Sequence, residues 1–133
     1  MIRIVDVPIY NTNVLFLLEA TAEEWVKFCS KKANKEKLHE EEIKEVSDEI
    51  SNDAWGGSVV TLLNNGGYVT IIKDANYPTY YLHELYHTAD RILRDRGVEH
   101  TEDDEAYAYM MGWLGQQYCD ILAEFNREKG GEQ

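Results

Sequence analysis

Residues 78–97 read PTYYLHELYHTADRILRDRG, a stretch that begins at a proline and ends at a glycine. Pro78 suits the first turn of a helix, where a missing backbone N–H costs nothing. Gly97 suits the left-handed position just beyond a helix C-terminus. Apolar residues recur between them at helical spacing, at Leu82, Leu85, Ala89, Ile92 and Leu93. The stretch therefore predicts one amphipathic helix of about four to five turns.

The same helix carries the pattern H-E-x-x-H at His83, Glu84 and His87. Residues four apart lie on one face of a helix, so both imidazoles can bind one ion. Neutral imidazole is a ligand of Zn²⁺, which prefers about four ligands in a tetrahedron. In a metallohydrolase Glu84 would take a proton from water held at the metal, without binding the metal itself. Chance occurrence of this short pattern is the alternative, so the chain has to supply a third ligand and a cleft.

The composition restricts the class of partner. The 133 residues include 25 Asp and Glu against 13 Lys and Arg, which gives a formal net charge of −12. This charge argues against binding to a nucleic-acid backbone or to an anionic membrane. It fits a solvated acidic surface, and it leaves open an acidic mimic of DNA or attraction of cationic partners. No apolar run approaches the ~20 residues of a membrane span and no signal peptide is evident, so we expect a cytoplasmic protein.

Two pairs of β-rich runs predict hairpins. Residues 2–9 and 14–18 are rich in β-branched or apolar types and predict two short strands. Residues 58–63 and 68–72 flank the turn sequence NNGG at 64–67, which is the strongest hairpin signal in the chain. We therefore expect a small antiparallel sheet that precedes the motif helix.

Two helices are predicted between these hairpins. Thr21 and Glu24 have the spacing of a capping box, and the helix that they begin runs to about residue 33. The highly charged residues 34–51 carry a thin apolar stripe, which predicts an exposed helix. One α+β domain over residues 1–133 is expected, with N-terminal strands and helices at 1–55 and the metal-site core at 58–126.

A final helix is predicted to begin near Asp104. Its expected buried stripe consists of Ala108, Met111, Gly115, Cys119 or Tyr118, and Leu122. Gly112 and Gly115 are poor helix formers, each costing up to ~1 kcal/mol relative to Ala. Beside Ala106 and Ala108 they make sense if this helix packs very closely against the motif helix.

A catalytic zinc site needs a third protein ligand. The candidates after the motif helix are His100, Glu102, Asp103, Asp104 and Glu105. The acids have an alternative role, since carboxylates favour helix N-termini, and this is the leading interpretation for Asp104. Glu105 stands where the final helix changes from acidic to small and aromatic residues, and its face continues at Ala108 and Gly112. We expect it to point inward, where a buried carboxylate needs a metal or a cation.

An H-E-x-x-H helix followed by a Glu one helix later resembles the gluzincin family of zinc peptidases. The order of hairpin, motif helix, short loop and Glu-bearing helix is similar to the minimal gluzincin core. Residues 103–114 read DDEAYAYMMGWL. They also resemble a pattern in small proteins of phage and prophage genomes, in which H-E-x-x-H is followed by D-E-x-x-A-Y-x-x-G-Y/W-L. The resemblance covers residues 58–115 well and the first 50 residues only loosely.

The resemblance implies that Zn²⁺ is held by His83, His87 and Glu105, with Glu84 as the general base for hydrolysis of a peptide bond. It also implies that residues 68–72 form the edge strand that holds an extended peptide by β-augmentation. The expected partner is a peptide or protein substrate, in the cytoplasm of a bacterium or of a phage-infected host cell.

The chain departs from larger gluzincins in two respects. Their separate C-terminal domain is missing, and no residue is assigned by the motif to steady the oxyanion. Tyr109, one turn beyond Glu105, is the first candidate for that role, with Tyr86 and Tyr107 behind it.

Asp90 follows His87 by about one turn, and two roles are open for it. It can accept a hydrogen bond from a metal-binding imidazole. It can equally form a surface ion pair with Arg91 or Arg94.

Two other functions remain open. The chain can be a non-catalytic zinc-binding phage or prophage protein that binds a host or phage partner. It can also be a metal-free acidic protein that mimics DNA. The two cysteines, Cys29 and Cys119, lie far apart and outside any C-x-x-C pattern, so we expect buried free thiols.

Overall fold

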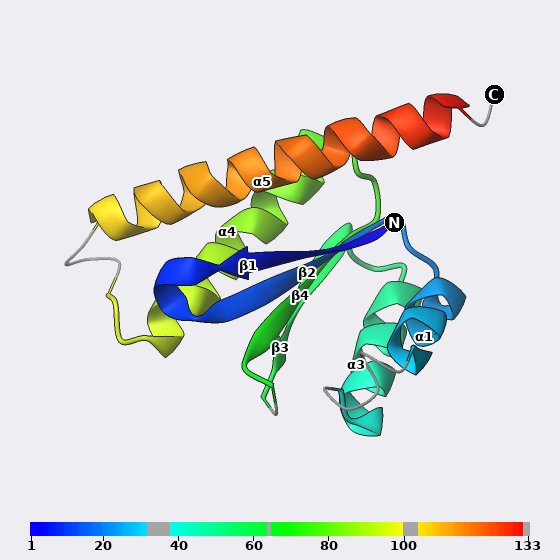
Figure 1. The fold of residues 1–133 in the computed structure, drawn as a ribbon, viewed down its shortest axis with the longest axis horizontal. Coiled ribbons are helices and arrows are strands. Elements are labelled where there is room, and N and C mark those ends of the chain that lie inside the picture. Colours follow the sequence, from blue (N-terminus) through cyan, green and yellow to red (C-terminus); the bar gives the residue numbers. More distant parts are fainter. Residues whose placement is uncertain (32–37, 64, 100–103, 132–133) are drawn as a thin grey trace.

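A computed structural model describes residues 1–31, 38–63, 65–99 and 104–131 (Figure 1). Within these residues a sheet of four strands is combined with α-helices, which confirms the expected α+β class. In chain order the elements are β1 (Ile2–Val7), the 3-10 helix η1 (Pro8–Tyr10), β2 (Thr12–Leu18), α1 (Ala22–Ser30), α3 (Glu40–Ser51), β3 (Gly57–Leu62), β4 (Gly67–Ile72), α4 (Pro78–Asp95) and α5 (Asp104–Gly131).

The strands lie in the order β1-β2-β4-β3, and the sheet is mixed. Both hairpins are antiparallel as predicted, but β2 and β4 pair in parallel, with Val14 opposite Tyr68 and Leu18 opposite Ile72. The expectation of a purely antiparallel sheet is therefore wrong. So is the assignment of residues 68–72 to an edge, because β4 is paired on both sides. The edge strand next to the motif helix is β3.

Alternation along β2 explains why helices cover both faces of the sheet. Phe16 packs in the core cluster with α4 and α5, whereas Leu15 and Leu17 pack in a second cluster with α1 and α3. Figure 1 shows the two helical layers on opposite sides of the strands. Val46 of α3 is fully buried and the indole N–H of Trp25 donates to the α3 backbone, so α3 is not the exposed helix that its charge suggested.

The buried face of α5 differs from the prediction by one residue. Its buried side chains are Tyr107, Met110, Leu114, Tyr118, Ile121 and Phe125. A shift of one residue rotates a helix face by about 100°. A Cβ added at Gly112 or Gly115 would meet no neighbouring described atom within 4 Å, so these glycines do not mark close packing on α4. The packing of α4 on α5 itself is as predicted, through larger side chains.

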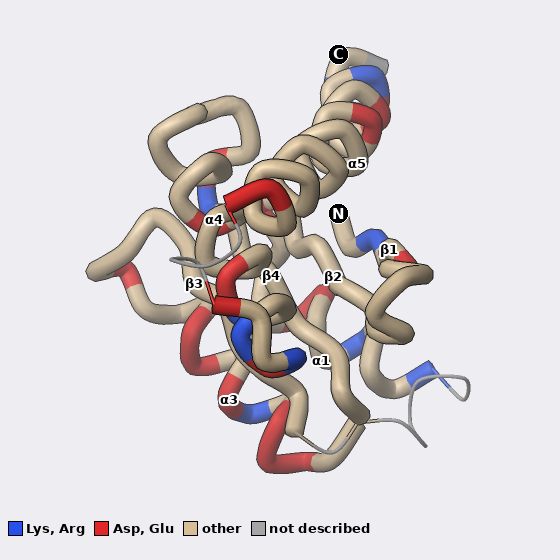
Figure 2. Tube along the Cα trace, turned by 90° about the vertical axis from the view of Figure 1, so that its left-hand side faces the viewer, with Lys and Arg blue, Asp and Glu red and all other residues tan. Residues whose placement is uncertain are grey.

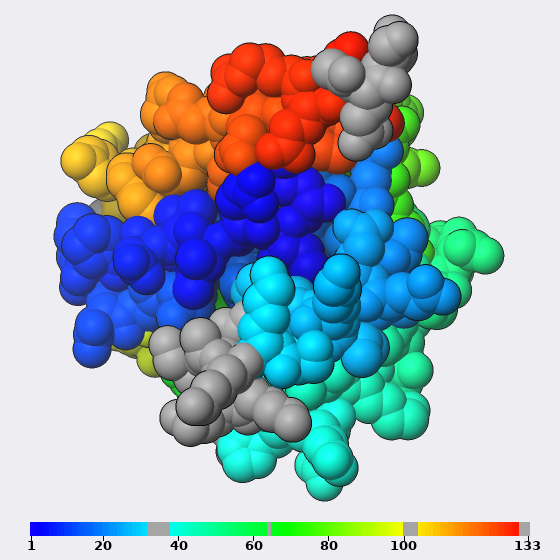
Figure 3. Space-filling view, turned by 45° about the vertical axis from the view of Figure 1, so that its right-hand side comes forward, coloured from blue at the N-terminus to red at the C-terminus, as the bar shows by residue number. Residues whose placement is uncertain are grey.

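The surface charge is spread over both helical layers. Figure 2 shows acidic positions on α3 as well as on α5, which lie on opposite faces of the sheet. Figure 3 shows β1 between α5 and α1, and the Arg3 guanidinium on β1 bonds Glu124 on α5. β1 and β3 are the two edge strands of the described sheet. No helix in the described ranges combines the length and apolar composition that a bilayer crossing requires.

Candidate metal centre

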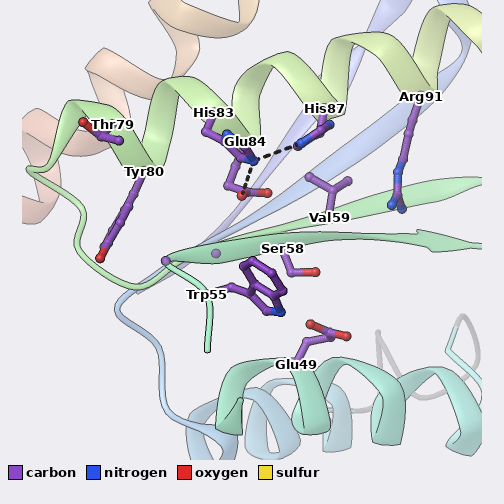
Figure 4. A pocket seen from close by; sticks show the side chains of 12 residues that line it. Glu49, Trp55, Ser58, Val59, Thr79, Tyr80, His83, Glu84, His87 and Arg91 are labelled. Carbon is purple, nitrogen blue, oxygen red and sulfur yellow. Dashed lines mark hydrogen bonds and ion pairs between the residues drawn. The ribbon is translucent and has the colours of Figure 1, made fainter. Parts of the chain in front are cut away.

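A pocket of about 470 Å³ opens between α4, the start of β3 and α3. Figure 4 shows the side chains of His83, Glu84 and His87 directed from α4 toward it, with Trp55 and Glu49 on the opposite wall. The three motif residues therefore meet at one concave site, which supplies the cleft that the pattern required.

The two imidazoles point at each other across one turn of α4. Their Nε2 atoms lie 3.0 Å apart. Two nitrogen ligands of a tetrahedral zinc ion, each at about 2.0–2.1 Å from the metal, lie about 3.3 Å apart. The observed separation is thus close to that of two ligands of one ion. Without a metal, the same geometry corresponds to a hydrogen bond in which one ring donates and the other accepts.

The protonation of His87 suits metal binding. Burial lowers the pKa of His87, and the neighbouring His83 and Arg91 lower it further, while Asp90 acts in the opposite direction. At neutral pH the ring is therefore neutral, which is the form that binds a metal ion.

Glu84 lies on the floor of the pocket and is only 5% exposed. Its Oε1 atom is 3.8 Å from Nε2 of His83. Burial raises the pKa of Glu84, and the electrostatic effects of His83 and Arg91 act in the opposite direction. The carboxylate has room because residue 57 is glycine: a Cβ there would lie 2.8 Å from Cγ of Glu84.

A buried hydrogen-bond chain fixes α4 over the sheet at the motif. The hydroxyl of Thr88 donates to the carbonyl oxygen of Glu84 at 2.8 Å, and Oγ1 of Thr70 on β4 is 2.7 Å from Oγ1 of Thr88. Because the Thr88 proton is already used, Thr70 is the donor in the second bond. These hydrogen bonds fix α4 against β4 at the turn of the helix that carries the two histidines.

The free edge of β3 borders the same pocket. Gly57, Ser58 and Val59 line it, and β3 pairs with β4 alone within the described sheet. Unpaired N–H and C=O groups on such an edge can bind an extended peptide. The edge that the resemblance placed at residues 68–72 is therefore available instead at β3.

Glu105 does not join the histidines. Its side chain is exposed and it does not line the pocket, so the expectation that it points inward is wrong. The reason is helical geometry: Glu105 lies two residues before the buried Tyr107, which places it about 200° around α5. In the described part of the chain no three potential ligands gather at one point. Asp104, at the start of α5, is exposed, and the candidates His100, Glu102 and Asp103 lie outside the described residues.

The tyrosines considered for the oxyanion lie elsewhere. Tyr109 is 71% exposed and lines a separate apolar pocket with Ile9 and Trp113. Tyr86 is also exposed, and the Tyr107 hydroxyl donates to Oδ1 of Asp90 at 3.0 Å.

Asp90 has its own partners. Besides the Tyr107 hydroxyl it binds the guanidinium of Arg94. Of the two roles left open for Asp90, the structure shows the ion pair, and it is formed with Arg94.

The pocket residues that the sequence did not indicate include Glu49, Trp55 and Arg91. Arg91 had a usable signal, because it continues the spacing of four that joins His83 to His87. Glu49 and Trp55 had none, since they reach the site only through the packing of α3 beside β3.

Comparison with known proteins identified no relative of this chain. No protein-family profile, no curated protein and no solved structure matches the chain, so its likeness to gluzincins rests on the motif and its surroundings alone.

Proposed function

We propose that the chain is a zinc-dependent hydrolase that cleaves a peptide bond, with His83 and His87 as metal ligands and Glu84 as the general base. One observation carries this proposal. Two imidazole nitrogens 3.0 Å apart share a pocket with a buried carboxylate, and the pocket borders the free edge of a strand. Metal ligands, base and peptide platform are thus adjacent.

When bound, zinc supplies Lewis acidity, which lowers the pKa of water and polarises a carbonyl group. Glu84 accepts the proton of the attacking water and returns it to the leaving amine. Its raised pKa favours this exchange near neutral pH, because the conjugate acid is formed more readily than on an exposed carboxylate. The substrate lies extended along β3, with its scissile carbonyl at the histidine pair.

The proposal includes a third protein ligand, as catalytic zinc sites have three. Glu105 is the candidate implied by the gluzincin resemblance, and it has to move into the pocket to serve. His100, Glu102 and Asp103 are the other candidates. Single replacements by Gln or Asn identify the ligand, because the correct one lowers zinc affinity far more than the other three.

The direct test compares the purified wild type with Glu84→Gln. Both proteins should bind zinc, and only the wild type should hydrolyse a library of capped peptides, with products identified by mass spectrometry. Loss of metal and structure together in the variant would leave no support for a general base. Equal hydrolysis by both proteins would exclude Glu84 from catalysis.

A second candidate is a non-catalytic zinc-binding phage or prophage protein that binds a host or phage partner. It is favoured by the two-ligand geometry, since the described residues bring no third ligand to the histidines. It predicts bound zinc, unchanged function in Glu84→Gln and a stable partner from the cytoplasm of the host. Hydrolysis that requires Glu84 would exclude it.

A further inference from the structure

Arg91 extends the row of motif side chains along the pocket. It stands one helical turn beyond His87, and Figure 4 shows its side chain directed from α4 toward β3. There its Nη1 atom donates to Oγ1 of Thr61 at 3.2 Å. A cationic group is therefore fixed between the motif helix and the edge strand.

The guanidinium of Arg91 forms no ion pair at contact distance with a carboxylate in the described part of the chain, although its charge acts on Glu84 from farther away. Arg96 and Arg127 likewise form no ion pair with a carboxylate among the described residues. Two other arginines are paired, Arg3 with Glu124 and Arg94 with Asp90. A guanidinium has five N–H donors, and Arg91 uses one on a neutral hydroxyl. Donors and charge therefore remain for a ligand.

The charge balance of the pocket gives Arg91 a distinct role. It is the one Lys or Arg among the described residues that line the pocket. The acids there are Glu84, on the floor, and Glu49, which enters from α3 on the opposite wall (Figure 4). An anionic ligand group would thus be attracted to the α4 side of β3, at Arg91.

Distance separates Arg91 from the reacting groups. Along α4 it is four residues past His87, about 6 Å. Along β3, Thr61 is four residues past Gly57, the glycine against Glu84, about 13 Å. An extended ligand advances about 3.3 Å per residue, so a group bound at Arg91 lies about two to four residues from the scissile bond. Arg91 is therefore placed for substrate recognition and not for the reacting carbonyl.

We propose that Arg91, held by Thr61, is a specificity-determining residue that binds a carboxylate of an extended peptide about two to four residues from the cleaved bond. This inference rests on the proposed peptide hydrolysis. A guanidinium and a carboxylate form two parallel charged hydrogen bonds, which fixes the register of the ligand on β3.

The direction in which the peptide runs along β3 determines whether the bound carboxylate is a side chain or the peptide C-terminus. β3 runs from Gly57 toward Thr61, so a peptide that pairs with it antiparallel has its amino-terminal part at Arg91. Antiparallel pairing is the more stable arrangement. The carboxylate is then an Asp or Glu side chain on the amino-terminal side of the bond. A peptide C-terminus would require the parallel direction.

The test measures binding, so that turnover is not needed. The zinc-loaded Glu84→Gln protein is titrated calorimetrically with capped polyalanine heptapeptides that have Glu or Gln at the centre. The Glu peptide should bind about tenfold tighter, the value of a charge-assisted hydrogen bond in a partly exposed site. Adding Arg91→Gln should remove the difference, and Arg91→Lys should keep part of it. Adding Arg94→Gln, the matched loss of charge on the same helix, should keep all of it.

A second peptide pair distinguishes the source. A polyalanine heptapeptide with a free C-terminus should bind no better than its amide, whereas a preference for the free carboxylate that depends on Arg91 would assign the anchor to a C-terminus. Thermal melts show whether each variant is folded. In the active enzyme, Arg91→Gln should raise KM for acidic peptides severalfold with kcat little changed.

The proposal that Arg91 binds a peptide carboxylate would be wrong if the protein that contains Arg91 bound the Glu and Gln peptides equally. It would also be wrong if this protein bound neither peptide. The two proposals fail separately. Glu84-dependent hydrolysis without an acidic preference removes the anchor alone. An Arg91-dependent preference without hydrolysis by the wild type removes the peptidase activity alone.

Discussion

Gly57 on β3 and Glu84 on α4 approach so closely that a Cβ atom on Gly57 would lie 2.8 Å from Cγ of Glu84 and 2.3 Å from the carbonyl oxygen of Ile71. Neither neighbour can yield freely, because one is backbone and the other is buried. We predict that Gly57→Ala lowers the free energy of unfolding by about 1–3 kcal/mol, as overpacking does. Because Glu84 is displaced, hydrolysis should fall more than zinc affinity. Urea unfolding, zinc titration and the peptidase assay measure the three quantities.

The matched control is Gly112→Ala in α5. A Cβ there meets no neighbour within 4 Å. This change should be neutral or stabilise the chain by up to about 1 kcal/mol, the difference in helix propensity. If both substitutions lowered the free energy of unfolding by a similar amount, the close approach of Gly57 to Glu84 would not be the cause of the loss in Gly57→Ala.

Glu84 makes stability depend on pH in a direction set by its raised pKa. The folded state holds the proton more tightly than the unfolded state. The stabilisation from the protonated form is therefore present below the unfolded pKa of about 4.3 and is lost as pH rises through the folded pKa. In chelator, Glu84→Gln should be more stable than the wild type at pH 7, with a difference that shrinks toward pH 4. Urea unfolding at pH 4, 5, 6 and 7 tests this; a wild type more stable than the variant at pH 7 would contradict it.

Asp90 should act on stability and not on zinc. It accepts the Tyr107 hydroxyl that joins α4 to α5 and pairs with Arg94. We predict that Asp90→Ala costs about 1–2 kcal/mol of unfolding free energy. Removing a hydrogen-bond partner of a ligand histidine typically weakens metal binding by about 10–100-fold. Asp90→Ala should therefore keep its zinc affinity within a factor of two of the wild type, and a larger loss would show that Asp90 supports a ligand histidine.

The control is Asp48→Ala, which breaks an exposed ion pair with Lys44 and should cost no more than about 0.5 kcal/mol of unfolding free energy.

The two cysteines should react very differently. Cys29 is buried against the sheet, and burial raises the pKa of its thiol to about 12. Cys119 is exposed, so the expectation that both thiols are buried is wrong for it. Native protein at pH 8 should release one equivalent of thionitrobenzoate quickly from Ellman's reagent, and a second only after denaturation. Cys119→Ser should remove the fast phase; a fast phase that survives would place Cys29 at the surface.

The local part of the fold was predictable from the sequence. β-rich runs around an Asn/Gly turn predict the β3–β4 hairpin, and the structure places its strands at Gly57–Leu62 and Gly67–Ile72. Pro78 begins α4 and Gly97, with φ of +76°, follows its end. Thr21 forms the predicted capping box. Each of these signals depends only on residues close together in the chain, so each can be recognised from the sequence alone.

The parallel pairing of β2 with β4 had no such signal. It joins strands that are separated along the chain by α1, α3 and β3, and a short apolar run does not indicate which strand it pairs with. Consequently the sequence could not show that β4 is internal and that β3 is the edge beside the pocket.

The orientation of α5 was ambiguous for a different reason. Its sequence has adjacent apolar pairs on successive turns: Met110 and Met111, Trp113 and Leu114, Tyr118 and Cys119, and Ile121 and Leu122. Either member of each pair can build a buried stripe, so periodicity alone does not fix the rotation. Packing buries the stripe of Tyr107, Met110, Leu114, Tyr118 and Ile121, and this choice exposes Glu105.

If His83 and His87 bind one metal ion together, titration of the metal-free protein with zinc against a competing chelator will show it. We expect one Zn²⁺ per chain for the wild type and for Glu84→Gln, and a loss of affinity of at least about tenfold in His83→Ala and in His87→Ala. A wild type that takes up no zinc, or zinc affinity that is unchanged when either histidine is replaced, would contradict it.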